Sequence, residues 1–232
     1  LSTLGPGATN LVTGVADADS DGAPLIALTG QVSTNKMHIT AHQFLDLVQL
    51  FEPITKRSKQ IVEPASVNEI IRLAFKYAES EKPGACHIDL PVNIAKLPVE
   101  ESEKPLIRRQ LPVELPSENA IKVAVDTINK AKRPVILAGN GAVRAHAEKA
   151  LTLFSNLLKI PVINTMMAKG IVPCDNAYSL LTIGTPQKDY VNKYIESADV
   201  VITVGYDIIE YSPDKWNYQN KASIVHIDAR PA

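Results

Sequence analysis

Glycine turns and polar residues near strand ends are the parts of this sequence that could do chemistry. Leu1 to Asn10 predicts the end of a strand, a tight Gly5-Pro6-Gly7 turn and the beginning of a helix at Leu11, with Thr9 and Asn10 as residues that often cap a helix. Glycine permits positive φ and the close approach of a ligand or a second backbone, and proline stiffens the turn. Such a turn can present main-chain N–H groups to a polar ligand, but it also occurs in any α/β protein.

A second glycine turn, Gly139-Asn140-Gly141, follows a predicted strand and precedes a predicted helix. This is the place of a dinucleotide-binding turn, but Arg144 stands where that fingerprint has its third glycine. The next predicted strand ends in Asn164 and Thr165 rather than in an acid that could bind a ribose. Gly139, Gly141 and Thr165 therefore indicate either a nucleotide pocket or a plain strand-loop-helix turn.

Two groups of metal-ligand residue types lack the rest of a metal site. Asp17 to Gly22 matches the first half of a calcium loop, but Leu28 occupies the position of the bidentate glutamate. His38 and His42 are four residues apart, yet Ile39 stands where a zinc helix carries glutamate. We therefore predict that this chain has no metal ligands.

Short apolar runs alternate with amphipathic segments along the chain. This alternation predicts an α/β fold with parallel sheets covered by helices on both faces. The predicted strands are 24–29, 54–62, 85–90, 134–138, 161–165, 198–204 and 222–227. The predicted helices are 11–19, 41–51, 66–79, 117–131, 145–158 and 186–197. His42 and Gln43 begin the second of these helices and are a candidate polar pair for a pocket.

A charged stretch punctuated by prolines separates two such α/β units. We predict a linker at 99–116 between a first domain at 1–98 and a second at 117–232. The chain opens within a motif and without methionine, and it stops just after a predicted strand. Both units are therefore expected to be truncated.

Composition excludes several classes of function. The 232 residues carry a net charge of −1, which gives no support to a nucleic-acid or membrane-surface role. No apolar run reaches membrane-spanning length and no signal peptide is visible, so we expect a cytoplasmic protein. Cys86 and Cys174 are expected to be buried small side chains rather than a disulfide, as suits a reducing compartment.

Several segments resemble the thiamine-diphosphate enzymes of the acetohydroxyacid synthase group. They are Thr3-Leu-Gly-Pro-Gly-Ala-Thr-Asn-Leu-Val-Thr-Gly14, Thr29-Gly-Gln31 and the stretch from Pro83-Gly84 to Pro91. Residues 41–56, 204–217 and 226–232 resemble acetolactate synthases, the last two especially the catabolic, butanediol-pathway form. The resemblance implies the later part of a pyrimidine-binding domain at 1–98 and a Rossmann-like middle domain at 117–232.

The reaction that this resemblance implies is the condensation of two pyruvates into 2-acetolactate and CO2, with chemistry supplied by thiamine diphosphate. It places Thr3, Gly5, Pro6, Gly7 and Asn10 beside the pyrimidine ring, and Gln43 and His42 near the reacting carbon. The family's activating glutamate and its magnesium motif fall outside this chain. We therefore expect this chain alone to be inactive, and the full-length protein to form a homodimer or homotetramer.

The resemblance also bears on flavin. Biosynthetic relatives hold FAD with arginines that Gly205–Tyr211 lacks here and have a lysine at the position of Val92, and the Gly139–Gly141 turn has two glycines rather than three. We therefore expect no FAD. Three alternatives remain open: an FAD-containing biosynthetic synthase of branched-chain amino acid synthesis, a non-catalytic nucleotide-binding module, and a thiamine-dependent decarboxylase or carboligase with another acceptor.

Overall fold

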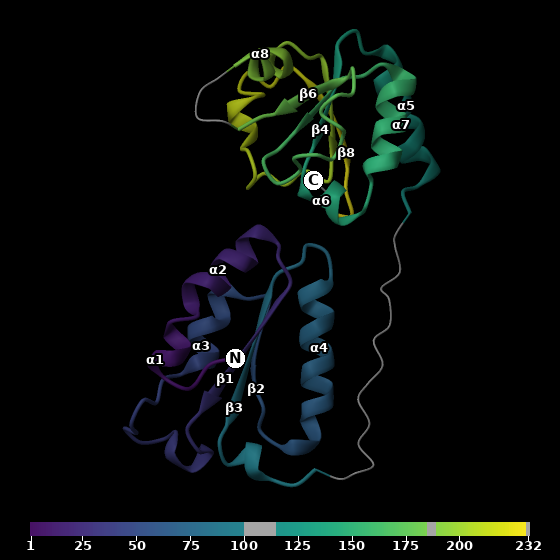
Figure 1. Ribbon diagram of the computed structural model, residues 1–232. Helices are drawn as coiled ribbons and strands as arrows, with labels where there is room; N and C mark the ends of the chain where they lie inside the picture. The colour runs from purple at the N-terminus through teal and green to yellow at the C-terminus, as the bar shows by residue number, and fades with distance from the viewer. Residues whose placement is uncertain (100–114, 185–188, 231–232) are drawn as a thin grey trace. The chain divides into compact units, whose positions relative to one another are not determined.

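The computed structural model describes residues 1–99, 115–184 and 189–230, and Figure 1 shows their elements. The chain divides into two compact units, Leu1–Pro112 and Val113–Ala232. The predicted linker at 99–116 lies almost wholly outside the described residues. Each unit is an α/β structure built on its own parallel sheet, as the alternation of apolar runs predicts.

The first unit contains a three-stranded parallel sheet in the order β1-β3-β2. Its strands are β1 (Leu25–Gln31), β2 (Arg57–Gln60) and β3 (Ala85–Pro91). Its helices are α1 (Pro6–Thr9), α2 (Val12–Asp21), α3 (Leu47–Phe51) and α4 (Val67–Glu79), with 3-10 turns at Thr34–Lys36, Glu52–Ile54, Pro64–Ser66 and Ile94–Lys96. Because the strands are parallel, their carboxyl ends lie at one edge of the sheet.

Helices cover both faces of this sheet (Figure 1). On one face, Ala27 and Ala85 pack with Val15 of α2 and with Phe51 of α3. On the other face, Ile88 and its neighbours pack against α4 through a separate group of buried residues, Ile61, Ala74, Ala78, Cys86 and Ile94. Successive strand residues point to opposite faces, and this alternation assigns each one to its core.

The second unit contains a five-stranded parallel sheet in the order β6-β5-β4-β7-β8. Its strands are β4 (Pro134–Ala138), β5 (Val162–Asn164), β6 (Ser179–Thr182), β7 (Val200–Val204) and β8 (Ser223–Ile227). Its helices are α5 (Glu118–Lys130), α6 (Asn140–Arg144), α7 (Glu148–Leu158) and α8 (Tyr190–Glu196), with a 3-10 turn at Pro213–Lys215. The strand order reverses between β4 and β7, which is the topological switch point of a doubly wound sheet.

Two expectations near the amino terminus are wrong. The helix predicted at 41–51 is confined to α3, because Asp46 caps it by accepting a hydrogen bond from the Gln49 N–H. Thr9 and Asn10 cap no helix N-terminus, since α1 begins earlier, at Pro6, where proline is favoured. Instead Thr9 donates a hydrogen bond to the Pro6 carbonyl, and Asn10 ends α1.

Two further features of the second unit differ from the sequence prediction. Strand β6 was not predicted, since this edge strand is mostly half-exposed and lacks a continuous apolar run. Cys174 is exposed rather than buried, because it follows Pro173 in the loop between β5 and β6. Cys86 is buried in β3 as expected, and both cysteines are free thiols.

Candidate functional site

The Gly5-Pro6-Gly7 turn lies at the carboxyl edge of the first sheet. Ser2 pairs with Thr29 as a parallel bridge, with its N–H donating to Leu28 and its carbonyl accepting from Gly30. The chain then leaves the sheet at this edge, where Gly5 has a φ of 55° before α1 begins. Ligands of open parallel α/β sheets bind outside this edge.

Gln43 contacts this turn although it is far from it in sequence. A Cβ added to Gly5 would lie 2.6 Å from the Gln43 carbonyl oxygen and 2.8 Å from its Cβ. Real Cβ atoms do not approach other atoms so closely, so only glycine fits at position 5. The structure therefore joins two residues that the sequence indicated separately. The sequence predicted that Gly5 permits the close approach of either a ligand or a second backbone. In the structure it is the backbone and Cβ of Gln43 that lie close to Gly5.

Gln43 has an unusual backbone conformation. Its φ is 60°, in the left-handed region, within a turn closed by a hydrogen bond from the Phe44 N–H to the Ala41 carbonyl. Glycine or asparagine normally occupies such a turn position. Residues held in sparsely populated conformations are common at functional sites. A glutamine here is consistent with a requirement for its side chain.

The other predicted residues of this site surround the turn in different ways. Thr3, Pro6 and Asn10 are exposed, as are His42 and Gln43. Gly7 allows the chain to fold back on itself, since its Cβ would lie 2.5 Å from Thr3 Cγ2. An open pocket of about 330 Å³ lies beside Thr3. Its lining residues are Leu1, Ser2, Thr3, Leu28, Thr29, Gly30 and Leu90.

A chain of buried polar side chains crosses the sheet next to this site. Asp89 of β3 accepts hydrogen bonds from Thr29 Oγ1 at 3.0 Å, from Gln60 Nε2 at 2.7 Å and from Gln31 Nε2 at 3.4 Å. Burial raises the pKa of the Asp89 carboxyl, although these three donors oppose the shift. These polar residues are visible in the sequence inside apolar strands, but the sequence did not predict that they form one hydrogen-bonded network around Asp89.

His87 continues the same chain toward β2. Its Nε2 lies 2.9 Å from Thr29 Oγ1 and its Nδ1 lies 2.8 Å from Ser58 Oγ. Since the Thr29 hydroxyl donates to Asp89, the pairing favours the tautomer in which Nε2 carries the proton. The His87 ring stacks on Phe51 with centroids 4.2 Å apart. Burial lowers the pKa of His87 to about 4, so the ring is neutral at physiological pH.

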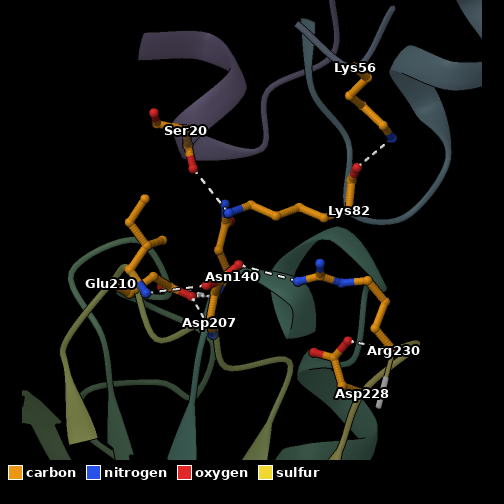
Figure 2. Close-up of polar contacts among 9 residues, drawn as sticks. Ser20, Lys56, Lys82, Asn140, Asp207, Glu210, Asp228 and Arg230 are labelled. Atoms are coloured by element: carbon orange, nitrogen blue, oxygen red, sulfur yellow. Dashed lines mark hydrogen bonds and ion pairs between the residues drawn. The ribbon is translucent and has the colours of Figure 1, made fainter. Parts of the chain in front are cut away.

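The second candidate site lies at the switch point between β4 and β7, and a carboxylate of the chain itself occupies it. Glu210 accepts hydrogen bonds from the Asn140 N–H at 3.0 and 3.1 Å and from the Asp207 N–H at 3.2 Å (Figure 2). The Thr165 hydroxyl also donates to Glu210. Residue spacing carried no signal for this role, because Glu210 lies in an irregular loop and two of its partners, Asn140 and Thr165, are far from it in sequence.

Gly139 and Gly141 pack tightly against the loop after β7. A Cβ on Gly139 would lie 2.5 Å from the Gly205 carbonyl oxygen and 2.7 Å from a Glu210 oxygen. The Gly141 N–H donates to that same Gly205 carbonyl at 2.8 Å. Both glycines of the predicted nucleotide turn thus allow close backbone packing against Gly205, and Gly139 and Thr165 also lie next to Glu210.

The described residues contain no group of three or more histidine, cysteine, aspartate or glutamate side chains arranged to hold a metal ion. Asp17, Asp19 and Asp21 belong to α2, which ends at Gly22 with a φ of 68°. Asp19 instead accepts a hydrogen bond from the Ala85 N–H. In the part of the chain that the structure describes, no helix is long and apolar enough to cross a membrane.

These two units belong to a known family. Residues 1–52 match the N-terminal TPP binding domain of thiamine pyrophosphate enzymes, and residues 121–232 match the central domain of the same enzymes. The chain therefore belongs to the thiamine pyrophosphate enzymes, and its two matches are to their N-terminal TPP binding domain and their central domain. This finding confirms the family, the α/β class and the two-unit architecture expected from the sequence.

Within that family the chain is similar to acetolactate synthases. It is 37% identical over 238 residues to the "Probable acetolactate synthase large subunit" of Methanococcus aeolicus, and 38% identical over 241 residues to that of Methanocaldococcus jannaschii. It is 33% identical over 231 residues to the "Acetolactate synthase" of Bacillus subtilis. These alignments cover 98–100% of this chain, but the chain spans about two fifths of the length of these relatives.

Proposed function

We propose that this chain is part of an acetolactate synthase that condenses two pyruvates into 2-acetolactate and releases CO2. The observation that carries the proposal is the contact between Gly5 and Gln43. It unites the turn and the glutamine that the resemblance assigns to the cofactor's pyrimidine ring and reacting carbon. The names of the similar proteins support the same activity.

In this proposal the first unit holds the pyrimidine side of thiamine diphosphate. Thr3, Pro6 and Asn10 are exposed on the turn, and the pocket beside Thr3 is lined mainly by apolar atoms, which suits an aromatic ring. When bound, the cofactor supplies the decarboxylation and the carbon–carbon bond formation. The Gln43 carboxamide can both donate and accept hydrogen bonds, so it can orient a pyruvate, and the exposed His42 adds a second polar group.

We also infer that this protein works without FAD. In a dinucleotide fold the main-chain N–H groups of the first turn bind a phosphate. Here the Asn140 N–H already binds the Glu210 carboxylate, and Gly139 leaves no room for an added methyl group against the loop of Gly205. These contacts disfavour both the FAD-containing biosynthetic alternative and the nucleotide-binding module. They favour the catabolic form.

Other parts of the proposal come from the resemblance. Mg²⁺ and the diphosphate are held by residues outside this chain, and the full-length protein acts as a homodimer or homotetramer in the cytoplasm. Pyruvate is the small-molecule partner, without a nucleic-acid or membrane partner. In the proposed reaction a second pyruvate is the acceptor. This use of pyruvate distinguishes an acetolactate synthase from a decarboxylase and from a carboligase with another acceptor.

The test is an assay of the full-length protein and of residues 1–232 alone. With pyruvate, thiamine diphosphate and Mg²⁺, we expect acetolactate from the full-length protein and none from residues 1–232. Acetaldehyde as the sole product would instead identify a decarboxylase. An absorbance band of bound flavin in the purified full-length protein would overturn the proposed independence from FAD.

A further inference from the structure

We propose that Gln31 is a positioning residue that holds the Gln43 turn against the sheet. This inference rests on the proposed function of Gln43, and it assigns a role to a buried side chain in the adjoining strand. Gln31 is the last residue of β1 and is only 2% exposed.

The hydrogen bonds of Gln31 run in three directions. Its Oε1 accepts from the Val32 N–H at 2.9 Å, which fixes the orientation of the carboxamide. Its Nε2 donates to the main-chain carbonyl of Leu45 at 2.9 Å and lies 3.4 Å from Asp89 Oδ2. Gln31 therefore connects the sheet interior to the loop two residues beyond Gln43.

Asp89 gives this connection a rigid base. It is fully buried on the central strand β3, and its register neighbours Thr29 and Gln60 lie directly opposite it on β1 and β2. Both donate hydrogen bonds to its carboxylate. Buried polar networks that satisfy their members are rigid and specify one arrangement.

The loop needs such support because Gln43 is strained. Its φ of 60° is held on one side by the close approach of Gly5. Asp46 fixes the far end of the loop by capping α3. The bond from Gln31 to Leu45 lies between these two points and ties the intervening backbone to the sheet. Together these three contacts fix the position of the backbone from which the Gln43 side chain extends.

The variant Gln31→Met tests this role, with Gln60→Met as its matched control. Each removes one carboxamide that donates to Asp89, but only Gln31 also reaches Leu45. We measure hydrogen exchange of the Phe44 and Gln49 amides and the kinetics of pyruvate turnover in the full-length protein. In Gln31→Met we expect exchange at these amides to rise at least about tenfold and kcat to fall about 10- to 100-fold, with a smaller change in KM.

Gln60→Met leaves the bond from Gln31 to Leu45 and the bond from Thr29 to Asp89 in place, so we expect it to change loop exchange and kcat by less than about twofold. Unchanged loop exchange in Gln31→Met, or an equal rise in both variants, would overturn the proposal. If Gln31→Met does not fold, Gln31→Asn replaces it, because it keeps the carboxamide but shortens its reach by one methylene. The exchange readout does not depend on the reaction. A wild-type protein without acetolactate synthase activity would therefore reject the proposed function and leave the test of loop positioning intact.

Discussion

Gly5 lies so close to Gln43 that no side chain fits at position 5 while the Gln43 backbone keeps its present position. Gly5→Ala should therefore displace the Gln43 turn. The new Cβ meets main-chain and Cβ atoms rather than a flexible side-chain end, and φ at this position is 55°. We expect pyruvate turnover by the full-length protein to fall about 10- to 100-fold and the free energy of unfolding to fall by about 1–2 kcal/mol.

Gly14→Ala is the matched control for this substitution. Gly14 lies inside α2, and apart from its chain neighbours and the backbone of its own helix no atom lies within 4 Å of a Cβ added there. Alanine in a helix interior should stabilise the protein by about 0.5–1 kcal/mol and leave turnover unchanged. Equal activity of the two variants would contradict the role assigned to the Gly5 contact.

Gln43→Gly separates stability from activity. Glycine relieves the left-handed strain at a φ of 60°, so we expect the free energy of unfolding to rise by about 0.5–1 kcal/mol while turnover falls at least about tenfold. Thermal unfolding and steady-state kinetics measure the two effects. Lys159→Gly at the end of α7, where φ is 56°, should give a similar gain in stability with normal activity. Retention of full activity by Gln43→Gly would remove Gln43 from the site.

Glu210→Gln tests the carboxylate at the switch point of the second unit. An amide group must turn one donor toward the donors that now surround Glu210, namely the Asn140 and Asp207 N–H groups and the Thr165 hydroxyl. We expect a loss of about 1–3 kcal/mol in the free energy of unfolding, measured in urea. The exposed Asp126 of α5 offers a control, since Asp126→Asn should change stability by less than about 0.5 kcal/mol. If Glu210→Gln left the free energy of unfolding unchanged, these hydrogen bonds would not be what holds the loop.

His87 predicts a pH dependence of stability. Its folded-state pKa of about 4 is below the ordinary value of 6.5, so between these values the unfolded chain binds a proton that the folded chain does not. Stability should therefore fall as the pH drops from about 6.5 toward 4, by at most about 3 kcal/mol, and the His87 contribution should be constant below that. The raised pKa of Asp89 acts with the opposite sign, because its protonation favours the folded state as the pH falls.

Comparison of His87→Gln with His38→Gln isolates the histidine effect. Urea unfolding at a series of pH values between 4 and 7 should show a flatter acid-side slope for His87→Gln than for the wild type. His38 is exposed, and its replacement should leave the slope unchanged. The same slope in all three proteins would rule out His87 as the source.

Much of the fold could be predicted because buried parallel strands consist of short runs of apolar residues, which can be recognised in the sequence. The runs at 134–138 and 85–90 correspond closely to β4 and β3. Edge strand β6 carries no such run, and the spacing of apolar residues at 41–51 could not show that Asp46 begins α3. Local patterns therefore identified the central elements better than edge strands and helix starts.

The candidate sites depended more strongly on tertiary contacts. Gly5, Gln43, Gly139 and Thr165 could be selected by residue type, but the approach of Gly5 to Gln43 depends on how two distant turns leave one sheet edge. Glu210 could not be selected, because an acid in a loop resembles any solvated acid until its partners are placed.

The strand orders of the two sheets have a consequence for the order in which the units can fold. In the first unit, β1 and β2 both pair with β3, which is the last of the three to be synthesised. In the second unit the central strand β4 comes first, and later strands can add to it on either side. On the ribosome, β1 and β2 cannot pair with β3 until the chain has emerged through Pro91, whereas β5 and later β7 can each pair with β4 as they appear. Among the strands that the structure describes, β1 and β2 therefore cannot pair with their common neighbour until the last strand of their sheet is synthesised, whereas β4 can take up β5 at once.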